Sequence, residues 1–223
     1  MRASVSVFAS TLLLAAVAAQ GAFAGAEQAY LGLHGSFSEV DDASAESALT
    51  NFDIGYDNGY GAAVALGWRF SNGFRAEGEL VFQTADVESF TITKDLINAP
   101  PLTGDTFTAA GEAEVLAPMI NVFYDLTLPD LMVRPYIGAG IGGAHLNLNA
   151  ENGPLLIGID DDNWAFAWQF MAGLAIPLSP EVSISGGYRY FDTNEMAVTD
   201  MFGNEYTTGY QSHSFDIGLQ IAL

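Results

Sequence analysis

The chain has 223 residues, no cysteine, and 27 acidic against 6 basic residues, so its formal net charge is −21. The lack of cysteine excludes disulfide scaffolds, thiol catalysis and cysteine–zinc sites. The negative charge argues against nucleic acid as a partner, because phosphate binding needs Lys and Arg. Half of the residues are hydrophobic, so we expect a folded chain.

The N-terminus has the pattern of a secretory signal peptide. Arg2 provides a positive start, residues 5–19 are apolar, and residues 22–24 (Ala-Phe-Ala) fit a small-x-small cleavage site. A membrane anchor helix is the alternative, but the apolar stretch is too short to cross roughly 30 Å of hydrocarbon. We therefore predict a signal peptide over residues 1–24 and a single domain over residues 25–223.

Apolar and polar residues alternate with period two along this domain. Near the C-terminus, Phe215, Ile217 and Leu219 fall on one face and Ser214 and Asp216 on the other. Side chains of a strand point alternately to opposite faces, so this pattern predicts two-sided strands. Eight strands are predicted, over residues 28–37, 59–70, 73–85, 112–126, 132–144, 164–177, 181–191 and 212–223.

The connections between these strands alternate between short and long. Short turns are expected near residues 71–73, 127–131 and 178–180, and long loops near residues 38–58, 86–111, 145–163 and 192–211. This alternation is typical of bacterial outer-membrane barrels. We predict an all-β, eight-stranded, antiparallel up-and-down transmembrane barrel with three short periplasmic turns and four long extracellular loops.

A soluble barrel would show the same period but would turn its apolar face inward. Its water-facing side should then carry many Lys and Glu residues. Here the polar face consists mainly of Gly, Ala, Ser and Gln, and Lys94 is the only lysine. The composition favours the membrane barrel, with small and polar residues enclosed and apolar residues against lipid.

Several motifs carry a resemblance to a known family. They are residues 134–142 (Arg-Pro-Tyr-Ile-Gly-Ala-Gly-Ile-Gly), the series Arg75, Glu77 and Glu79, and residues 165–169 (Ala-Phe-Ala-Trp-Gln). The chain resembles the small outer-membrane barrels of the OmpA/OmpX/Opa type, and most of all the eight-stranded surface proteins of alphaproteobacteria. The resemblance implies the outer membrane of a Gram-negative bacterium. The final Leu223 departs from the usual terminal Phe.

An eight-stranded barrel is just wide enough for its own side chains. Charges inside it must be paired, because an isolated buried ion costs several kcal/mol. We expect Arg189 to pair with Glu79 or Asp216. The polar interior as a whole has two interpretations: a static polar plug, or a gate in a narrow ion path. The predicted interior network comprises Arg75, Glu77, Glu79, Asp125, Gln169, Arg189 and Asp216; Arg75 is expected to pair with Glu77 or Asp125.

The predicted loops hold most of the acidic residues. Their field should repel polyanions and attract cations. One interpretation is that the charge provides solubility in salty water; the alternative is that divalent cations bridge the loops to one another or to lipopolysaccharide. Outer-membrane lipids and lipopolysaccharide are the expected partners. Asp160, Asp161 and Asp162 are the best candidates for a Mg²⁺ or Ca²⁺ site, because carboxylates are hard ligands. They lack the spacing of an EF-hand.

Catalysis has weaker support. A lipid hydrolase would need a base within reach of a hydroxyl, and His34 with Ser36, or His213 with Ser214, are the candidates. We expect no enzyme and no cofactor. The predicted role is structural and interfacial, in a monomer or weak oligomer that presents acidic loops outside the cell. A narrow, low-conductance porin-like channel is the alternative.

Overall fold

The computed structural model describes residues 26–48, 50–95, 102–126, 128, 132–152, 157–199 and 203–223. These residues form a single antiparallel β-sheet. Its strands are β1 (Ala26–Val40), β2 (Ala43–Glu46), β3 (Thr50–Phe70), β4 (Phe74–Asp95), β5 (Thr106–Asp125), β6 (Arg134–Asn152), β7 (Ile157–Pro177), β8 (Val182–Thr193), β9 (Met196–Thr199), β10 (Glu205–Thr208) and β11 (Gln211–Ala222).

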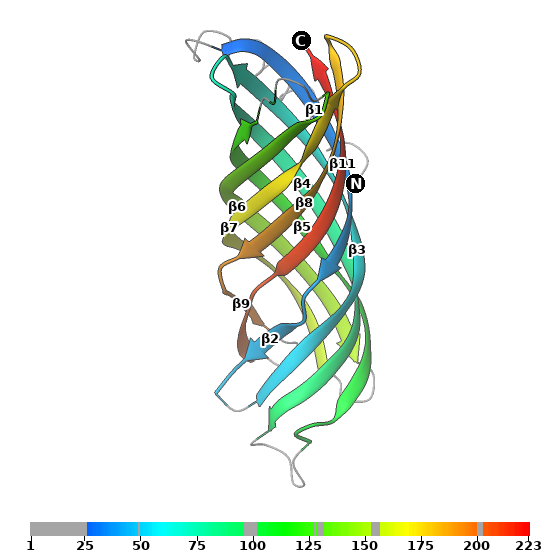
Figure 1. Cartoon of the computed structure of the whole chain (residues 1–223). Coiled ribbons are helices and arrows are strands. Elements are labelled where there is room, and N and C mark those ends of the chain that lie inside the picture. Colours follow the sequence, from blue (N-terminus) through cyan, green and yellow to red (C-terminus); the bar gives the residue numbers. More distant parts are fainter. Residues whose placement is uncertain are drawn as a thin grey trace, which may run out of the picture.

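Eight of these strands close into a ring, as predicted. The order runs from β1 through β11, β8, β7, β6, β5 and β4 to β3, and β3 pairs with β1. Figure 1 shows the tilted strands of this barrel, with the C-terminus at one end and β2 and β9 at the other. The expected eight-stranded, antiparallel barrel is confirmed. The predicted signal peptide, residues 1–24, lies outside the described residues.

The predicted long loops are wrong in extent, because strands occupy most of them. β4 has 22 residues and β3 has 21, whereas a tilted strand crosses a bilayer in about 9–11 residues. β8 and β11 have only 12 residues each. The strands therefore form a tall wall along β3–β7, where they are long, and a low wall along β1, β11 and β8, where they are shorter.

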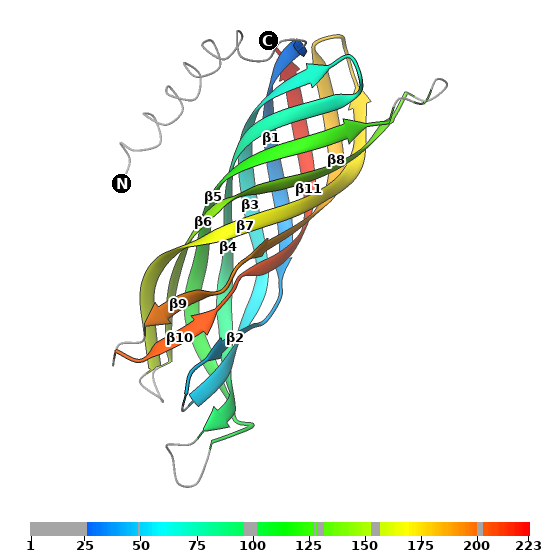
Figure 2. The same cartoon turned by 90° about the vertical axis from the view of Figure 1, so that its left-hand side faces the viewer.

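Three short strands complete the tall side. β2 pairs with β3, β10 pairs with β2 and β9 pairs with β10, while β9 contacts β7. Figure 2 shows β2, β9 and β10 beyond the ends of β1, β8 and β11. We call this part the distal half: β2, β9 and β10 with the segments of β3–β7 beside them. The remainder of the ring, which holds the turns at residues 71–73 and 178–181, is the proximal half.

The polarity of the two faces reverses between these halves. In the proximal half of β4, Glu77 and Glu79 point inward and are buried, while Phe82 points outward with 41% of its surface exposed. In the distal half of the same strand, Phe90 points inward and is fully buried, and Glu88 is exposed. An apolar exterior suits lipid and a polar exterior suits water. The outer face of β4 is therefore suited to lipid in the proximal half and to water in the distal half.

The apolar exterior forms a belt around the proximal half. Its members include Ile120, Ile141, Phe170, Phe215 and Ile217, which are 57–76% exposed. An exposed apolar surface of this extent marks a membrane or protein contact. Among the described residues there is no α-helix that is both long enough and apolar enough to span a membrane.

Candidate functional site

An ionic layer fills the lumen of the proximal half. Arg189 on β8 donates from Nη2 to Glu79 Oε1 on β4 at 2.8 Å, and from Nε to Asp216 Oδ2 on β11 at 2.8 Å. Its Nη1 donates to Gln169 Oε1 at 2.8 Å. All four side chains are at least 90% buried. The structure thus brings Arg189 to both carboxylates that the sequence offered as partners.

Amide side chains complete the coordination of Glu79. Gln169 Nε2 donates to Glu79 Oε2 at 3.0 Å and to Asn121 Oδ1 at 2.7 Å. Asn121 Nδ2 in turn donates to Glu79 Oε2 at 2.8 Å. A buried charge is tolerated when it is paired and its remaining lone pairs are hydrogen-bonded, and this carboxylate meets both conditions.

Arg75 forms a second ion cluster nearer the turn ends. Its Nε lies 2.9 Å from Asp125 Oδ2, and its Nη1 donates to Glu77 Oε1 at 2.7 Å. The same Nη1 donates to the Tyr30 hydroxyl at 2.9 Å, and that hydroxyl donates to Glu77. The guanidinium also lies 4.4 Å from the centre of the Phe123 ring. Both expected partners, Glu77 and Asp125, are engaged at once.

Tyr30 is a member of this cluster that the sequence analysis missed. It is only 1% exposed and faces the lumen from β1. The available signal was its position four residues before His34, on the same side of a strand. A tyrosine in an apolar stretch suggests a membrane-interface position, and this masked its inward orientation.

A hydroxyl–amide layer lies beyond the ionic layer. Ser38 Oγ and Ser214 Oγ are 2.8 Å apart, and Ser212 Oγ donates to Gln83 Oε1 at 3.1 Å. These four side chains are 0–1% exposed. The sequence placed Ser214 on the enclosed polar face but did not indicate this layer, because small residues are common on the inward face of every strand.

The distal half encloses an apolar core instead. Phe52 packs edge-to-face against Phe90, with ring centres 5.4 Å apart, and against Tyr206 at 5.0 Å. Ile54, Leu148 and Val115 share this core and are at most 1% exposed. The lumen is therefore filled at three successive levels: by ions, by hydroxyl and amide groups, and by apolar side chains.

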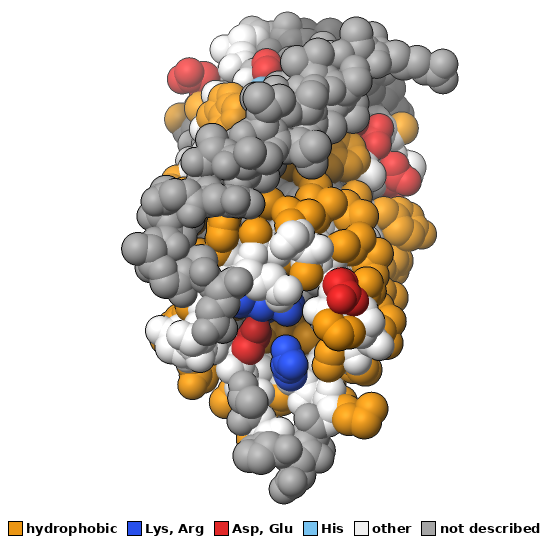
Figure 3. Space-filling view, turned by 90° about the horizontal axis from the view of Figure 1, so that it is seen from above, with side chains coloured by type: hydrophobic (Ala, Val, Ile, Leu, Met, Phe, Trp, Pro, Cys, Tyr) orange, Lys and Arg blue, Asp and Glu red, His pale blue; other side chains and the backbone are white. Residues whose placement is uncertain are grey.

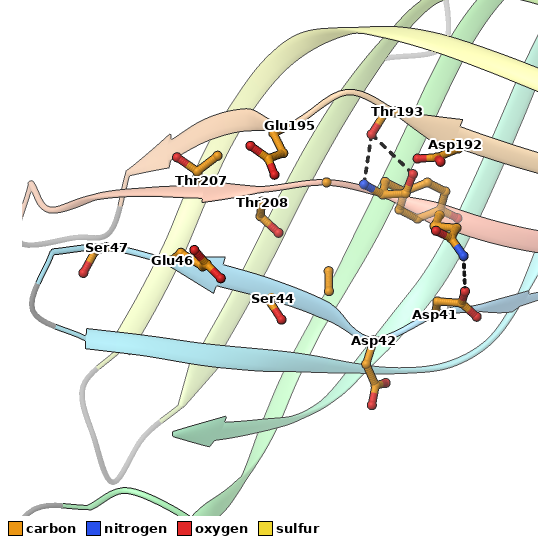
Figure 4. Close-up of a pocket in the computed structure, with 14 residues that line it drawn as sticks. Asp41, Asp42, Ser44, Glu46, Ser47, Asp192, Thr193, Glu195, Thr207 and Thr208 are labelled. Atoms are coloured by element: carbon orange, nitrogen blue, oxygen red, sulfur yellow. Dashed lines mark hydrogen bonds between the residues drawn. The ribbon is translucent and has the colours of Figure 1, made fainter. Parts of the chain in front are cut away.

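An acidic side pocket opens at the step between the low and the tall wall. It has a volume of about 730 Å³ and lies where β1 passes into β2, β8 into β9 and β10 into β11. Figure 4 shows carboxylates from the first two junctions and threonines from the strand before the third around it. The carboxylates are Asp41, Asp42, Glu46, Asp192 and Glu195. The sequence analysis missed this pocket, because its residues come from three separate segments.

Hydrogen bonds and an ion pair with neighbouring side chains engage two of these carboxylates. Asp41 accepts from Gln211 Nε2 and lies 3.4 Å from His213 Nε2, and Asp192 Oδ2 accepts from the Tyr190 hydroxyl at 3.1 Å. Within the part of the chain that the structure describes, no group of three His, Cys, Asp or Glu residues could hold a metal ion.

The three candidate metal ligands of the sequence analysis lie in β7. The Asp160 and Asp161 side chains are outside the described residues, so this site stays a prediction. Asp162 Oδ2 lies 3.0 Å from His145 Nε2 on β6, and 69% of the Asp162 side chain is exposed.

Neither candidate catalytic pair forms a working arrangement. Among the described residues His34 Nε2 is buried without a hydrogen-bond partner. The ring of His213 bonds the Tyr188 hydroxyl, while Ser214 Oγ pairs with Ser38. Asp216, an acid on the same strand as His213 and Ser214, is held by Arg189. A serine hydrolase needs base, hydroxyl and acid in one chain of hydrogen bonds.

An apolar belt around a closed antiparallel ring with a polar, ion-paired lumen defines an integral barrel of the bacterial outer membrane. The family described as "Outer membrane protein beta-barrel domain" matches residues 9–221, and the chain belongs to this family. In barrels of this kind the short turns face the periplasm and the longer connections face the outside of the cell, which is the orientation expected from the sequence.

Individual relatives agree with this placement. The chain is 27% identical to an "Outer membrane protein" of Gluconacetobacter diazotrophicus, over all of this chain and 64% of the relative. It is 24% identical to "Outer membrane protein PagN" of Salmonella typhimurium, over 86% of this chain and 83% of the relative. Proteins of unassigned function from Brucella abortus are 26% identical over 64% of this chain and 54% of their own length. The chain thus spans about half to two thirds of several curated relatives.

Solved structures share the fold. The neisserial surface protein A aligns with a TM-score of 0.53 and 15% identity, covering 89% of this chain and 99% of its own. OprG from Pseudomonas aeruginosa aligns with a TM-score of 0.54 and 14% identity, covering 88% of this chain and 98% of its own. Both are small outer-membrane barrels.

Proposed function

We propose that this outer-membrane barrel is a closed structural protein that presents an acidic, folded extracellular half, and that it neither conducts ions nor catalyses a reaction. The observation that carries the proposal is the filled lumen. The ion-paired layer around Arg189 and the apolar core around Phe90 block the axis in series. Ions would have to break buried pairs and then pass through a dehydrated core, which is costly.

The acidic exterior supports a role at the surface. Asp86 on β4 and Glu112 on β5 are directly opposite in the ladder, and both are exposed. Like charges in this position destabilise a sheet, and Thr84 Oγ1 offsets this in part by donating to Glu112 at 2.5 Å. We propose that divalent cations gather at this exterior and link it to anionic lipopolysaccharide. Calorimetry with millimolar Ca²⁺ should give heat that falls in an Asp86→Asn variant.

A narrow channel is the second candidate, and one observation favours it. In the described lumen, Asp216 Oδ1 and His34 Nε2 are buried without hydrogen-bond partners, and both residues border a small void beside Arg189. Rearrangement of Arg189 between Glu79 and Asp216 would be the gating step of such a channel.

Single-channel recording on protein refolded into planar bilayers separates the two candidates. A closed barrel predicts silent bilayers for the wild type and only rare, small events for Arg189→Ala. Steady conductance steps in the wild type that change in Arg189→Ala would establish the channel. A heat-dependent mobility shift on an unboiled gel serves as the control for folding of both proteins.

A further inference from the structure

A hollow of about 390 Å³ opens at the periplasmic mouth of the barrel. Arg69 from β3 and Arg134 from β6 line it, together with Gln28 of β1, Ser183 of β8 and the turn that follows β7. Figure 3 looks onto this end of the molecule and shows basic side chains in the opening with an acidic side chain beside them. The hollow lies on the barrel axis, because its lining comes from opposite sides of the ring.

These two arginines differ from the other basic residues of the described chain. Arg75 and Arg189 are held in buried ion pairs, and Lys94 donates to the backbone carbonyl oxygen of Ala48 at 2.9 Å. Within the described residues, Arg69 and Arg134 have no carboxylate within ion-pair distance. In a chain with 27 acidic residues, two guanidinium groups in one hollow that have no ion-pair partner among the described residues are an exception that calls for a ligand.

The surroundings hold Arg69 in place without neutralising it. Its guanidinium lies over the Tyr30 ring, 4.9 Å from the ring centre, and one Nη2 proton goes to Gln220 Oε1. Its Nε is buried with no partner among the described residues. Nearby acids are already engaged: Asp125 with Arg75, and Glu181 with the Ser179 hydroxyl. Among the described residues, Arg69 Nη1 and the Arg134 guanidinium have no hydrogen-bond partner, so both groups can bind a ligand.

We propose that the periplasmic mouth is an oxyanion-binding site, in which Arg69 and Arg134 together hold a phosphate group. A planar guanidinium fork matches phosphate oxygens in two-point contacts, and Ser183 and Gln28 add neutral donors at the same hollow. A bound anion would also remove the repulsion between two cations that share one opening. Two sources supply this chemistry: a free phosphate-bearing solute of the periplasm, and the headgroup of an inner-leaflet phospholipid.

The test uses the full mature barrel in micelles of an alkyl maltoside, a detergent without phosphate, titrated with inorganic phosphate and followed through the ¹⁵Nε signals of its arginines. Saturable shifts of Arg69 and Arg134 are expected, with the Arg75 and Arg189 signals unchanged. The Arg134→Gln variant should weaken binding about tenfold or more. Lys94→Gln removes the same charge at the opposite end of the barrel and should leave binding unchanged.

A second arm identifies the source. Nanodiscs that contain phosphatidylglycerol should shift the same two signals without added phosphate if a headgroup occupies the site, and should titrate with phosphate like the micelles if the ligand is a free anion. Absence of saturable shifts in both arms, or equal weakening in Lys94→Gln, would overturn the proposal. Because Arg134 is exposed at the rim, its variant should fold and keep the test informative should Arg69→Gln fail to fold.

Discussion

Arg189 and Glu79 lie 110 residues apart in sequence and meet in the lumen through two parallel hydrogen bonds, Nη2 to Oε1 at 2.8 Å and Nη1 to Oε2 at 3.0 Å. Such a two-point contact fixes the relative positions of β8 and β4 across the barrel. It also makes each partner dependent on the other, because neither has access to water.

Removal of Arg189 should therefore be costly. Arg189→Met leaves Glu79 and Asp216 buried without their cation, and we expect a loss of about 3–5 kcal/mol in the free energy of unfolding. Urea unfolding in lipid vesicles measures it. Arg134→Met, which removes an exposed arginine, should change stability by less than about 0.5 kcal/mol. Equal losses in the two variants would show that the ion pair is not the cause.

The distal core can be tested by truncating one ring. Phe90→Ala empties a fully buried position and should cost the distal half about 3–5 kcal/mol. Limited proteolysis should then cut the distal half while the proximal half keeps its heat-dependent mobility shift. Glu88→Ala, on the exposed side of the same strand, is the matched control, and cleavage of both variants alike would contradict the assignment of the core.

The wall beside Tyr30 has no room for a side chain. A Cβ at Gly67 would lie 2.2 Å from the Tyr30 ring, whereas a Cβ at Gly78 would meet nothing within 4 Å. We expect Gly67→Ala to lower stability by about 1–3 kcal/mol through overpacking, and Gly78→Ala to be tolerated. Thermal unfolding of the two variants can be compared through the heat-dependent mobility shift on gels. A Gly67→Ala variant as stable as the wild type would mean that Tyr30 moves aside freely.

Alkaline pH should weaken the distal half through Tyr210, which lies at the junction of β10 and β11. Burial raises the pKa of Tyr210 above its ordinary value of 10. Above pH 10 the unfolded chain loses this proton while the folded chain keeps it, so stability falls as pH rises, by up to about 1.4 kcal/mol per pH unit. Unfolding curves below and above pH 10 measure the slope. Tyr210→Phe should reduce the slope, and an unchanged slope would exclude this residue as the source.

The sequence predicts the proximal half well because one rule governs it. Strict alternation on β11 and β7 indicated which side chains face lipid, and the polar remainder, including Glu79 and Gln169, had to face the lumen. Pairing then followed from the cost of an isolated charge. Which of two carboxylates Arg189 would choose could not be decided, since the structure uses both.

The distal half escaped prediction for physical reasons. Its strands turn apolar residues inward, so the polarity rule that worked for the lipid-facing part is inverted there. Register shifts between Val87 and Ser89, and between Tyr56 and Gly59, also break the period of two. The four-residue strands β2, β9 and β10 are too short to show a period at all.

The contact between β2 and β10 has a mechanical consequence. The ladder joins them at a single position, Thr207 opposite Glu46, whereas each neighbouring pair of tall strands is joined along most of its length. The distal half should therefore open first between β2 and β10 when the protein is heated or pulled. The rings of Phe52 and Tyr206, packed just beneath this contact, would be the first hydrophobic groups to meet water, while the span held in the bilayer stays intact.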